Sequence, residues 1–371
     1  MIDPTAALDA RILNAIVAYA LDDDAFLTLA QALFAYQVAG NAPYAAYASS
    51  RGYDGVRLPE RIEDIPAVPA AAFKEERLAT FPSHQCALWF ETSGTTRGTG
   101  GRHEFDTPFL YEAALLASFD RMMLADGARL RYLLLVPDPN ERPHSSLGFM
   151  MDVVARLRGD GEHGWYAHAD ALDVDGFLTA VERACAEDAA VCLATTAFAL
   201  VALLDALAER SRSPVLPLGS RIMETGGFKG RSRSVSRAEL YRETSERLGV
   251  PVDAIVAEYG MTELTSQYYD APESRGAIEP RIKRSPPWLR PLVVDGEGNR
   301  VADGIVGAIR HVDLANRGSV IAIDTEDLGA AVEGGIVLLG REAGAELRGC
   351  SLDAEDLIAQ TKTKPSAHGG P

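Results

Sequence analysis

The feature that most constrains the fold is a regular alternation in the middle of the chain. Short apolar runs, of the length expected for buried strands, alternate with segments whose apolar residues recur at helical spacing. Strand–helix alternation of this kind predicts a mostly parallel sheet flanked by helices. The expected strands are 130–137, 190–196, 220–225 and 253–257, and the expected helices are 177–186, 197–210 and one from a capping box at Ser236 and Glu239 to Gly249.

The two ends of the chain differ from this middle. Residues 6–50 are rich in alanine with apolar residues at helical spacing, which predicts two or three helices. In the last third, 291–301 has the pattern of a strand–turn–strand hairpin. Further strands are expected at 307–313, 319–325 and 335–340, so this part is predicted to be antiparallel.

Composition narrows the class of protein. The 371 residues carry a formal net charge of −17, which argues against a nucleic-acid partner. There is no apolar stretch of membrane-spanning length and no signal-peptide pattern, so we expect a cytoplasmic protein without a membrane span. The cysteines are scattered along the chain, so we expect free thiols in a reducing compartment. They are Cys86, Cys185, Cys192 and Cys350. Cys86, Cys185 and Cys192 fall in apolar patterns and are expected in the core.

Three polar loops each follow an apolar run. The first, E-T-S-G-T-T-R-G-T-G-G-R at 91–102, combines glycines, hydroxyls and arginines that can surround a phosphate, although a plain mobile loop is the alternative. The second is M-E-T-G-G-F-K-G at 223–230, where a flat ring can lie against the glycines, although a plain strand–turn–helix junction is the more common case for two glycines alone. The third is E-Y-G-M-T-E-L at 258–264. Because ligands bind at the carboxyl ends of parallel strands, we expect all three loops to converge on one sheet edge.

These loops belong to an ordered series of motifs. T-S-G-T-T near 92, G-G near 226, Y-G-M-T-E at 259–263, T-E-D-L-G at 325–329 and G-R at 340–341 resemble the core motifs of the adenylate-forming superfamily, which includes acyl-CoA synthetases and peptide-synthetase adenylation domains. The chain looks most like the acyl-protein synthetase (LuxE-type) branch. The features closest to that branch are F-K at 73–74, H-S-S-L-G-F-M-M-D at 144–152, Y-G-M-T-E-L-T-S-Q-Y-Y at 259–269 and E-L-R-G-C-S-L at 346–352.

The resemblance covers nearly the whole chain and implies a fold. It is the α/β large-domain fold of adenylate-forming enzymes, with mostly parallel sheets flanked by helices and a C-terminal antiparallel β part. The regions implied are an N-terminal helical part at 1–84, an α/β nucleotide-binding core at 85–285, an antiparallel β part at 286–340, and a hinge remnant with a disordered tail at 341–371.

The resemblance also implies an ATP site. The loop near 92 would hold the phosphates, while two glycines and Tyr259 would line the adenine. Asp327 matches the aspartate that holds the ribose hydroxyls, and Arg341 the arginine near it. The cofactor-binding residues expected in this way are Thr92, Ser93, Gly94, Thr95, Thr96, Arg102, Gly226, Gly227, Tyr259, Gly260, Asp327 and Arg341.

The catalytic roles follow in the same manner. Thr262 would contact phosphate, and Glu263 would contact phosphate and Mg²⁺, a cation that prefers oxygen ligands. Cys350 stands where the branch has a cysteine that accepts the acyl group, and Arg348 beside it favours the thiolate; an incidental surface thiol is the alternative. His144 and Phe228 are expected to contact the acid substrate.

Two departures from the superfamily stand out. The phosphate loop runs R-G-T-G-G-R and lacks the usual lysine, which Arg102 is a candidate to replace. Only 30 residues follow Arg341, fewer than the ~50 that a further domain needs. The superfamily's mobile C-terminal domain, with its catalytic lysine, is therefore not expected here, and the LuxE-type branch also lacks it.

The sequence therefore predicts an acid–thiol ligase that uses ATP and Mg²⁺. A carboxylic acid, fatty or other acyl, would become acyl-AMP, and the acyl group would pass to a thiol and then to an acyl reductase or an acyl-carrier protein. Two alternatives stay open: adenylation of an aryl acid in a natural-product pathway such as phenazine modification, and a nucleotide- or acyl-binding protein without turnover. The oligomeric state is not readable from the sequence.

Overall fold

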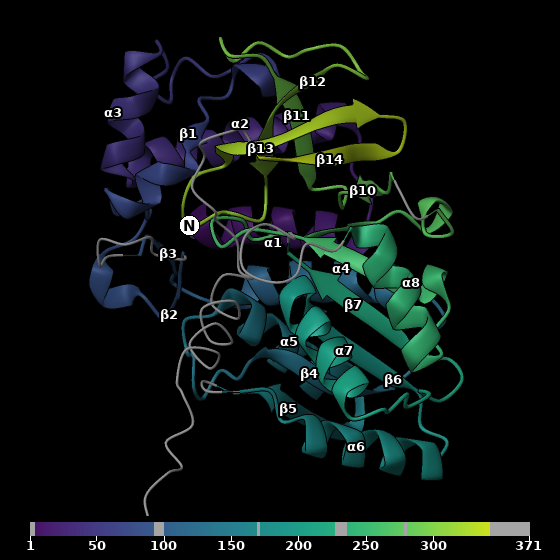
Figure 1. The fold of residues 1–371 in the computed structure, drawn as a ribbon. Coiled ribbons are helices and arrows are strands. Elements are labelled where there is room, and N and C mark those ends of the chain that lie inside the picture. Colours follow the sequence, from purple (N-terminus) through teal and green to yellow (C-terminus); the bar gives the residue numbers. More distant parts are fainter. Residues whose placement is uncertain (1–3, 93–99, 169–170, 227–235, 278–279, 342–371) are drawn as a thin grey trace, which may run out of the picture. The chain divides into compact units, whose positions relative to one another are not determined.

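The computed structural model describes residues 4–92, 100–168, 171–226, 236–277 and 280–341 (Figure 1). The chain forms two compact units, which we describe one at a time. The β-rich unit comprises Met1–Ala125, Tyr259–Ser274 and Pro280–Arg348. The α/β unit comprises Asp126–Glu258, Arg275–Glu279 and Gly349–Pro371. The four regions expected from the sequence stay a prediction.

The α/β unit is built on a parallel sheet whose strands are ordered β8-β7-β6-β4-β5. This confirms the alternation expected from the sequence, and the teal and green part of Figure 1 shows the helices α5 to α8 beside these strands. The strands are β4 (Leu130–Pro137), β5 (Gly159–Ala167), β6 (Val191–Thr196), β7 (Arg221–Thr225) and β8 (Ile255–Tyr259), and the helices are α5 (Ser146–Arg158), α6 (Val174–Ala186), α7 (Ala197–Glu209) and α8 (Arg237–Leu248).

Burial of apolar side chains explains how these strands and helices pack. Strands β4 and β6 are buried along their whole length, as expected for parallel strands covered on both faces. Helices α6, α7 and α8 contribute their apolar residues to one cluster with β4, β6 and β7, and α5 packs on β4 and β5 outside that cluster. The expected capping box starts α8, with Ser236 and Glu239 bonded reciprocally, and the helix ends at Gly249 in the left-handed conformation.

The β-rich unit contains an antiparallel sheet in the order β11-β12-β13-β14-β10-β9, with β1 added parallel to β13. A second, two-stranded sheet pairs β2 with β3. Its helices are α1 (Pro4–Ala18), α2 (Asp23–Gly40), α3 (Ala42–Ser50) and α4 (Phe109–Met123), and its strands are β1 (Val68–Pro69), β2 (Leu88–Glu91), β3 (Arg102–Phe105), β9 (Tyr268–Asp270), β10 (Ile282–Arg284), β11 (Leu289–Val294), β12 (Val306–Asp313), β13 (Ala322–Val332) and β14 (Gly335–Arg341).

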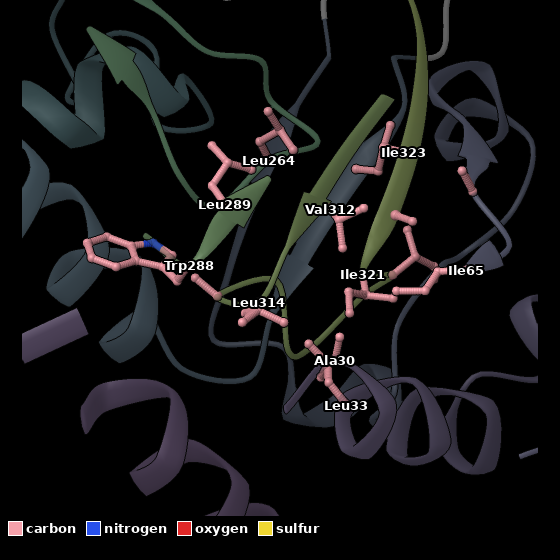
Figure 2. Close-up of a cluster of buried hydrophobic side chains, with 14 of the residues drawn as sticks. Ala30, Leu33, Ile65, Leu264, Trp288, Leu289, Val312, Leu314, Ile321 and Ile323 are labelled. Carbon is pink, nitrogen blue, oxygen red and sulfur yellow. The ribbon is translucent and has the colours of Figure 1, made fainter. Parts of the chain in front are cut away.

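One apolar core joins the N-terminal helices to this sheet (Figure 2). Ala30 and Leu33 of α2 lie close to Ile321, from the segment that leads into β13. Trp288 is fully buried, and its indole nitrogen donates to the Ser266 hydroxyl at 2.9 Å. The helices at 6–50 are thereby confirmed, and they have a structural role, because they cover one face of the antiparallel sheet.

The expected strand boundaries in the last third are corrected in two places. The segment 291–301 turns back on itself as expected, and the Val301 amide donates to the Val293 carbonyl at 2.9 Å. Its second arm, however, forms only the isolated bridge from Arg300 to Val294, and the regular partner of β11 is β12. The strand expected at 319–325 extends to Val332, because β13 is paired with β12 on one side and β14 on the other. Among the described helices, none combines the length and the apolar character needed to cross a bilayer.

A buried ion cluster in the β-rich unit gives a test of this packing. The Asp270 carboxylate contacts Arg281 Nη1 at 2.8 Å and Lys283 Nζ at 2.7 Å, with all three side chains at most 2% exposed. Asp270→Asn removes the charge that both cations contact, so we expect the free energy of unfolding to fall by about 3–5 kcal/mol in urea titrations.

The matched control is Glu273→Gln. Glu273 makes an exposed ion pair with Arg284 in the same unit, and its loss is expected to cost no more than about 1 kcal/mol. Equal effects of the two substitutions would contradict the account of the buried cluster.

Candidate functional site

In the α/β unit, the second and third polar loops begin side by side. Strands β7 and β8 are parallel neighbours, with Thr225 opposite Glu258 in register at their carboxyl ends. The Thr225 hydroxyl donates a short hydrogen bond to the buried Glu258 carboxylate. Gly226 follows at once with φ of 93°, a conformation that favours glycine. Glu258, to which the sequence assigned no role, therefore ties the two strand ends together.

In the β-rich unit, Tyr259 is at the centre of a chain of hydrogen bonds. Its hydroxyl donates to Asp327 Oδ2 at 2.8 Å and lies 3.3 Å from His311 Nε2. His311 Nδ1 lies 2.7 Å from the Tyr268 hydroxyl. The structure thus brings together two residues expected at the nucleotide, Tyr259 and Asp327, and adds two that the sequence analysis did not select, His311 and Tyr268.

The proton positions in this chain follow from counting donors. Tyr259 has one hydroxyl proton and gives it to Asp327, so it accepts from His311, whose Nε2 must carry the proton. His311 Nδ1 then accepts from the Tyr268 hydroxyl. Burial lowers the pKa of His311 to about 4, against the opposing charge of Asp327, so the ring is neutral at pH 7 as this direction requires.

Asp327 is held by the irregular part of β13. A register shift falls between Leu328 and Gly329, and the Thr325 hydroxyl donates to the Ile309 carbonyl at 2.7 Å and accepts from the Asp327 amide at 3.2 Å. Irregularities of this kind re-aim a side chain out of the regular ladder. Asp327 is half-buried and lies opposite Arg341 in the register of β13 and β14, so these two expected residues are cross-strand neighbours.

Thr262 and Glu263 lie in the buried loop after Tyr259, where side chains bond to their backbone. His103 Nδ1 donates to the Thr262 carbonyl at 2.8 Å, and Asn316 Nδ2 donates to the Glu263 carbonyl at 3.0 Å. Burial lowers the pKa of His103 to about 4, although its contacts with Thr262 and Asn316 act in the opposite direction. The loop is thus fixed from β3 and from the segment after β12.

The same loop is fixed further along by a buried carboxylate. Asp313 accepts from the Thr265 amide at 3.0 Å and the Ser266 hydroxyl at 2.8 Å. Burial raises the pKa of Asp313 to about 6, and its hydrogen bonds limit this rise. Since Ser266 also accepts from Trp288, the loop is connected directly to the apolar core.

The first polar loop does not follow a strand of the parallel sheet, contrary to expectation. It connects β2 and β3 of the small antiparallel sheet in the β-rich unit. Its neck is closed by two hydrogen bonds, from the Thr92 amide to the Gly101 carbonyl at 2.9 Å and from the Gly101 amide to the Thr92 hydroxyl at 2.8 Å. A Cβ at Gly101 would lie 2.7 Å from the Phe73 carbonyl oxygen, so this close approach requires glycine.

Arg102 lies at the base of that loop. It is exposed, and its guanidinium is 5.1 Å from the centre of the Trp89 ring. A cavity of about 210 Å³ beside it is lined by 73–79, Gly100, Arg102 and Glu104. This is smaller than the ~300 Å³ of a usual small-molecule pocket.

The thiols differ in environment. Burial raises the pKa of Cys192 to about 12, against the weaker effect of Arg221, so this thiol is a core residue as expected. Cys86 is half-buried, and burial also raises its pKa. Cys185 is exposed, which corrects the expectation of a core position: its side of α6 faces solvent.

His144 precedes α5 in the α/β unit and is half-buried. Gly260 comes directly after β8 and is also half-buried. Several expected site residues lie outside the described part of the chain, and for Arg341 only the backbone is described. Those outside are Ser93, Gly94, Thr95, Thr96, Gly227, Phe228 and Cys350.

His311 and Tyr268 could have been found from the sequence by one signal. His311 interrupts the apolar pattern of G-A-I-R-H-V-D within an expected strand, and Tyr268 lies in the Q-Y-Y that follows the third loop. A polar residue in a buried strand needs a hydrogen-bond partner. Which partner it has depends on strand register, and register is not readable from a single sequence.

Glu263, the residue expected from the sequence at Mg²⁺, has a buried side chain. Within the described residues there is no group of three or more His, Cys, Asp or Glu side chains placed to hold a metal. Mg²⁺ at nucleotide sites is commonly held by one or two carboxylates together with phosphate oxygens and water. Glu263 carries such a carboxylate, in a loop whose backbone is fixed at the Thr262 carbonyl and at the carbonyl of Glu263 itself.

The low pKa of His311 predicts an acid-sensitive fold. Between pH 6.5 and about 4 the unfolded chain takes up a proton at His311 that the folded chain does not, so its contribution to stability is lost as pH falls. We expect His311→Gln to lose less stability than the wild type between about pH 7 and about pH 4.5, by up to about 3 kcal/mol.

Urea titrations at the two pH values measure this difference. His84→Gln, at an exposed histidine in the same unit, should keep the wild-type loss. If His311→Gln loses as much stability on acidification as the wild type, then His311 is not the buried neutral group described here.

The sequence of this chain is similar to those of known proteins. The family model described as "Acyl-protein synthetase, LuxE" matches residues 23–358. The long-chain-fatty-acid–luciferin-component ligase of Aliivibrio fischeri is 22% identical over 279 residues, which cover 73% of this chain and 70% of that protein.

Solved structures of 2-hydroxyisobutyryl-CoA ligase share the fold. An open conformation of 2-hydroxyisobutyryl-CoA ligase, in complex with 2-HIB-AMP and CoA, matches with a TM-score of 0.65 and 15% identity, over 86% of this chain and 69% of that one. The amide bond synthetase McbA of Marinactinospora thermotolerans matches with a TM-score of 0.49 and 20% identity, over 70% of this chain. The present chain covers only about half of that structure, 49%.

Proposed function

Since the chain belongs to the acyl-protein synthetase (LuxE) family, we propose that it activates a fatty or other acyl acid with ATP and transfers the acyl group to a thiol. The family and the shared fold confirm the expected class, an adenylate-forming acid ligase. The name of the Aliivibrio fischeri relative, a long-chain-fatty-acid ligase, supports an acid of the fatty type.

The observation that carries the proposal is the hydrogen bond between Tyr259 and Asp327. These residues belong to motifs that are far apart in the chain and that resemblance assigns to adenine and to ribose. Their contact within the β-rich unit is what a common nucleotide site requires. An aromatic ring offers a stacking surface for a base, and a carboxylate accepts hydrogen bonds from ribose hydroxyls.

In the proposed reaction, a carboxylate oxygen of the acid attacks the α-phosphorus of ATP, and pyrophosphate leaves as acyl-AMP forms. Asp327 holds the ribose and Tyr259 the adenine, so the α-phosphorus is oriented for attack, and Thr262 contacts phosphate. Bound Mg²⁺, with Glu263 as its protein ligand, would offset charge on the triphosphate. A thiolate then attacks the acyl carbonyl carbon, AMP leaves, and a thioester is formed.

The roles of the other site residues are proposed from the resemblance to the motifs of the family. Gly226, Gly227 and Gly260 are assigned to the nucleotide, and His144 and Phe228 to the acid. Cys350 is the proposed acyl acceptor, with an acyl reductase or a carrier protein as the next recipient. The loop that begins at Thr92 is assigned to the ATP phosphates, with Arg102 at its base.

Pyrophosphate release tests the function directly. Wild-type protein with ATP, Mg²⁺ and a panel of fatty and aryl acids should release pyrophosphate with at least one acid. Asp327→Asn should lower kcat/KM for ATP by about 10- to 100-fold, because a charged hydrogen-bond acceptor is lost. Glu326→Gln, at the exposed neighbour on β13, should leave kcat/KM within about twofold.

The acid that supports pyrophosphate release shows whether the substrate is a fatty acid or an aryl acid. ATP binding without pyrophosphate release from any acid would contradict the proposal and favour a binding protein without turnover. Equal losses in Asp327→Asn and Glu326→Gln would contradict the ribose assignment alone.

Acyl labelling tests Cys350. With the reactive acid carrying a radiolabel, we expect protein-bound label that hydroxylamine removes, as for a thioester. Cys350→Ala should abolish this label and leave pyrophosphate formation in the first turnover intact. Cys185→Ala is the matched control, because Cys185 is an exposed thiol of the α/β unit. Full labelling of Cys350→Ala would show that another group accepts the acyl chain.

A further inference from the structure

Three rings and one carboxylate form a connected unit inside the β-rich part of the molecule. Tyr268 on β9, His311 on β12 and Tyr259 at the end of β8 pack against each other, with ring centres 5.4–5.8 Å apart. Tyr268 and His311 are fully buried, whereas Tyr259 and Asp327 are half-buried. The two inner residues therefore lie behind the two that solvent reaches.

The hydrogen bonds of this unit run in one direction. Tyr268 donates to His311, His311 donates to Tyr259, and Tyr259 donates to Asp327. Each proton position follows from the next, because a phenol and a neutral imidazole have one proton each. The carboxylate at the end accepts and cannot donate when it is ionised. If any one of these hydrogen bonds ran in the opposite direction, two acceptor atoms would therefore face each other.

Such a chain restricts how Tyr259 and Asp327 can turn. The last side-chain torsions of tyrosine and aspartate are both broad, so hydrogen bonds help to fix how the ring and the carboxylate are turned. The His311 proton holds the Tyr259 oxygen in place, and the Tyr259 proton holds one oxygen of Asp327. Both solvent-facing groups are thereby oriented before any ligand arrives, which lowers the entropy cost of binding.

We infer that Tyr268 and His311 are positioning residues for ATP, which act by holding Tyr259 and Asp327 in the orientation that binds adenosine. This inference rests on the proposed function, since it takes ATP as the ligand of Tyr259 and Asp327. Neither Tyr268 nor His311 touches the reacting atoms. Their loss therefore weakens the binding of ATP more than it slows the chemical step.

Tyr268→Phe is the central variant, because it keeps the buried ring and removes only the donor to His311. We expect its Kd and KM for ATP to rise about three- to tenfold, as for loss of a neutral hydrogen bond, with kcat within about twofold. Tyr44→Phe is the matched control. Tyr44 is equally buried in the same unit, but its hydroxyl donates to the Pro66 carbonyl at 2.9 Å, outside the chain.

A double-substitution cycle tests whether Tyr268 acts through Tyr259. Tyr259→Phe keeps the ring and removes the proton that goes to Asp327. If the chain is one unit, the Kd of Tyr259→Phe combined with Tyr268→Phe should equal that of the weaker-binding single variant. Multiplication of the two single effects would show that Tyr268 acts independently and would overturn the inference.

A spectroscopic measurement is independent of activity. With ¹⁵N-labelled histidine, the signal that disappears in His311→Gln should report a neutral ring protonated at Nε2 at pH 7, and Tyr268→Phe should shift its Nδ1 resonance. Protonation at Nδ1 would overturn the inference.

The failures of the inference and of the proposed function are distinguishable. If the wild type binds ATP but Tyr268→Phe changes Kd no more than Tyr44→Phe, the positioning inference fails and the proposed function stands. If the wild type binds no ATP, the proposed function fails, and the inference fails with it.

Discussion

The hydrogen bond from Tyr259 to Asp327 is the interaction on which the β-rich unit's candidate site depends. It joins the end of β8 to the irregular part of β13, two segments that lie 68 residues apart in the chain. On the Tyr259 side, the following loop is fixed by His103, Asn316 and Asp313 through its backbone. The site is therefore held on both sides by buried polar contacts, which favours a preformed binding surface.

Part of this architecture was predictable from local pattern. The parallel sheet followed from alternating apolar and helical segments, and the capping box at Ser236 marked the start of α8 correctly. Strand partners in the antiparallel part were not predictable, because the regular pairing of β11 with β12 depends on which strand buries its face. Similarly, the loop after Thr92 had the composition of a phosphate loop, but its place in a two-stranded hairpin is a tertiary property. The apolar pattern of this short helix predicted a core position for Cys185, which is exposed. Such a pattern does not distinguish residues at the edge of the buried helix face from residues within that face.

The candidate site residues were also only partly predictable from the sequence. Motif order pointed to Tyr259, Thr262, Glu263 and Asp327, and the structure places all four in the β-rich unit. His311 and Tyr268 were missed because the role of a buried polar side chain is recognised only when its hydrogen-bond partner is known. Tyr259, Tyr268 and His311, which are partners in this chain of hydrogen bonds, come from three different strands. Their role, if they orient ATP, shows how a site can be set by residues that never contact the ligand.

If this chain joins an acid to AMP, an oxygen atom of the acid must end up in the nucleotide product. When the carboxylate of the acid carries ¹⁸O, attack on the α-phosphorus and later loss of AMP leave one labelled oxygen in AMP. Mass spectrometry of the nucleotide product should therefore show AMP heavier by about two mass units. Unlabelled AMP, or ADP as the product, would contradict the account.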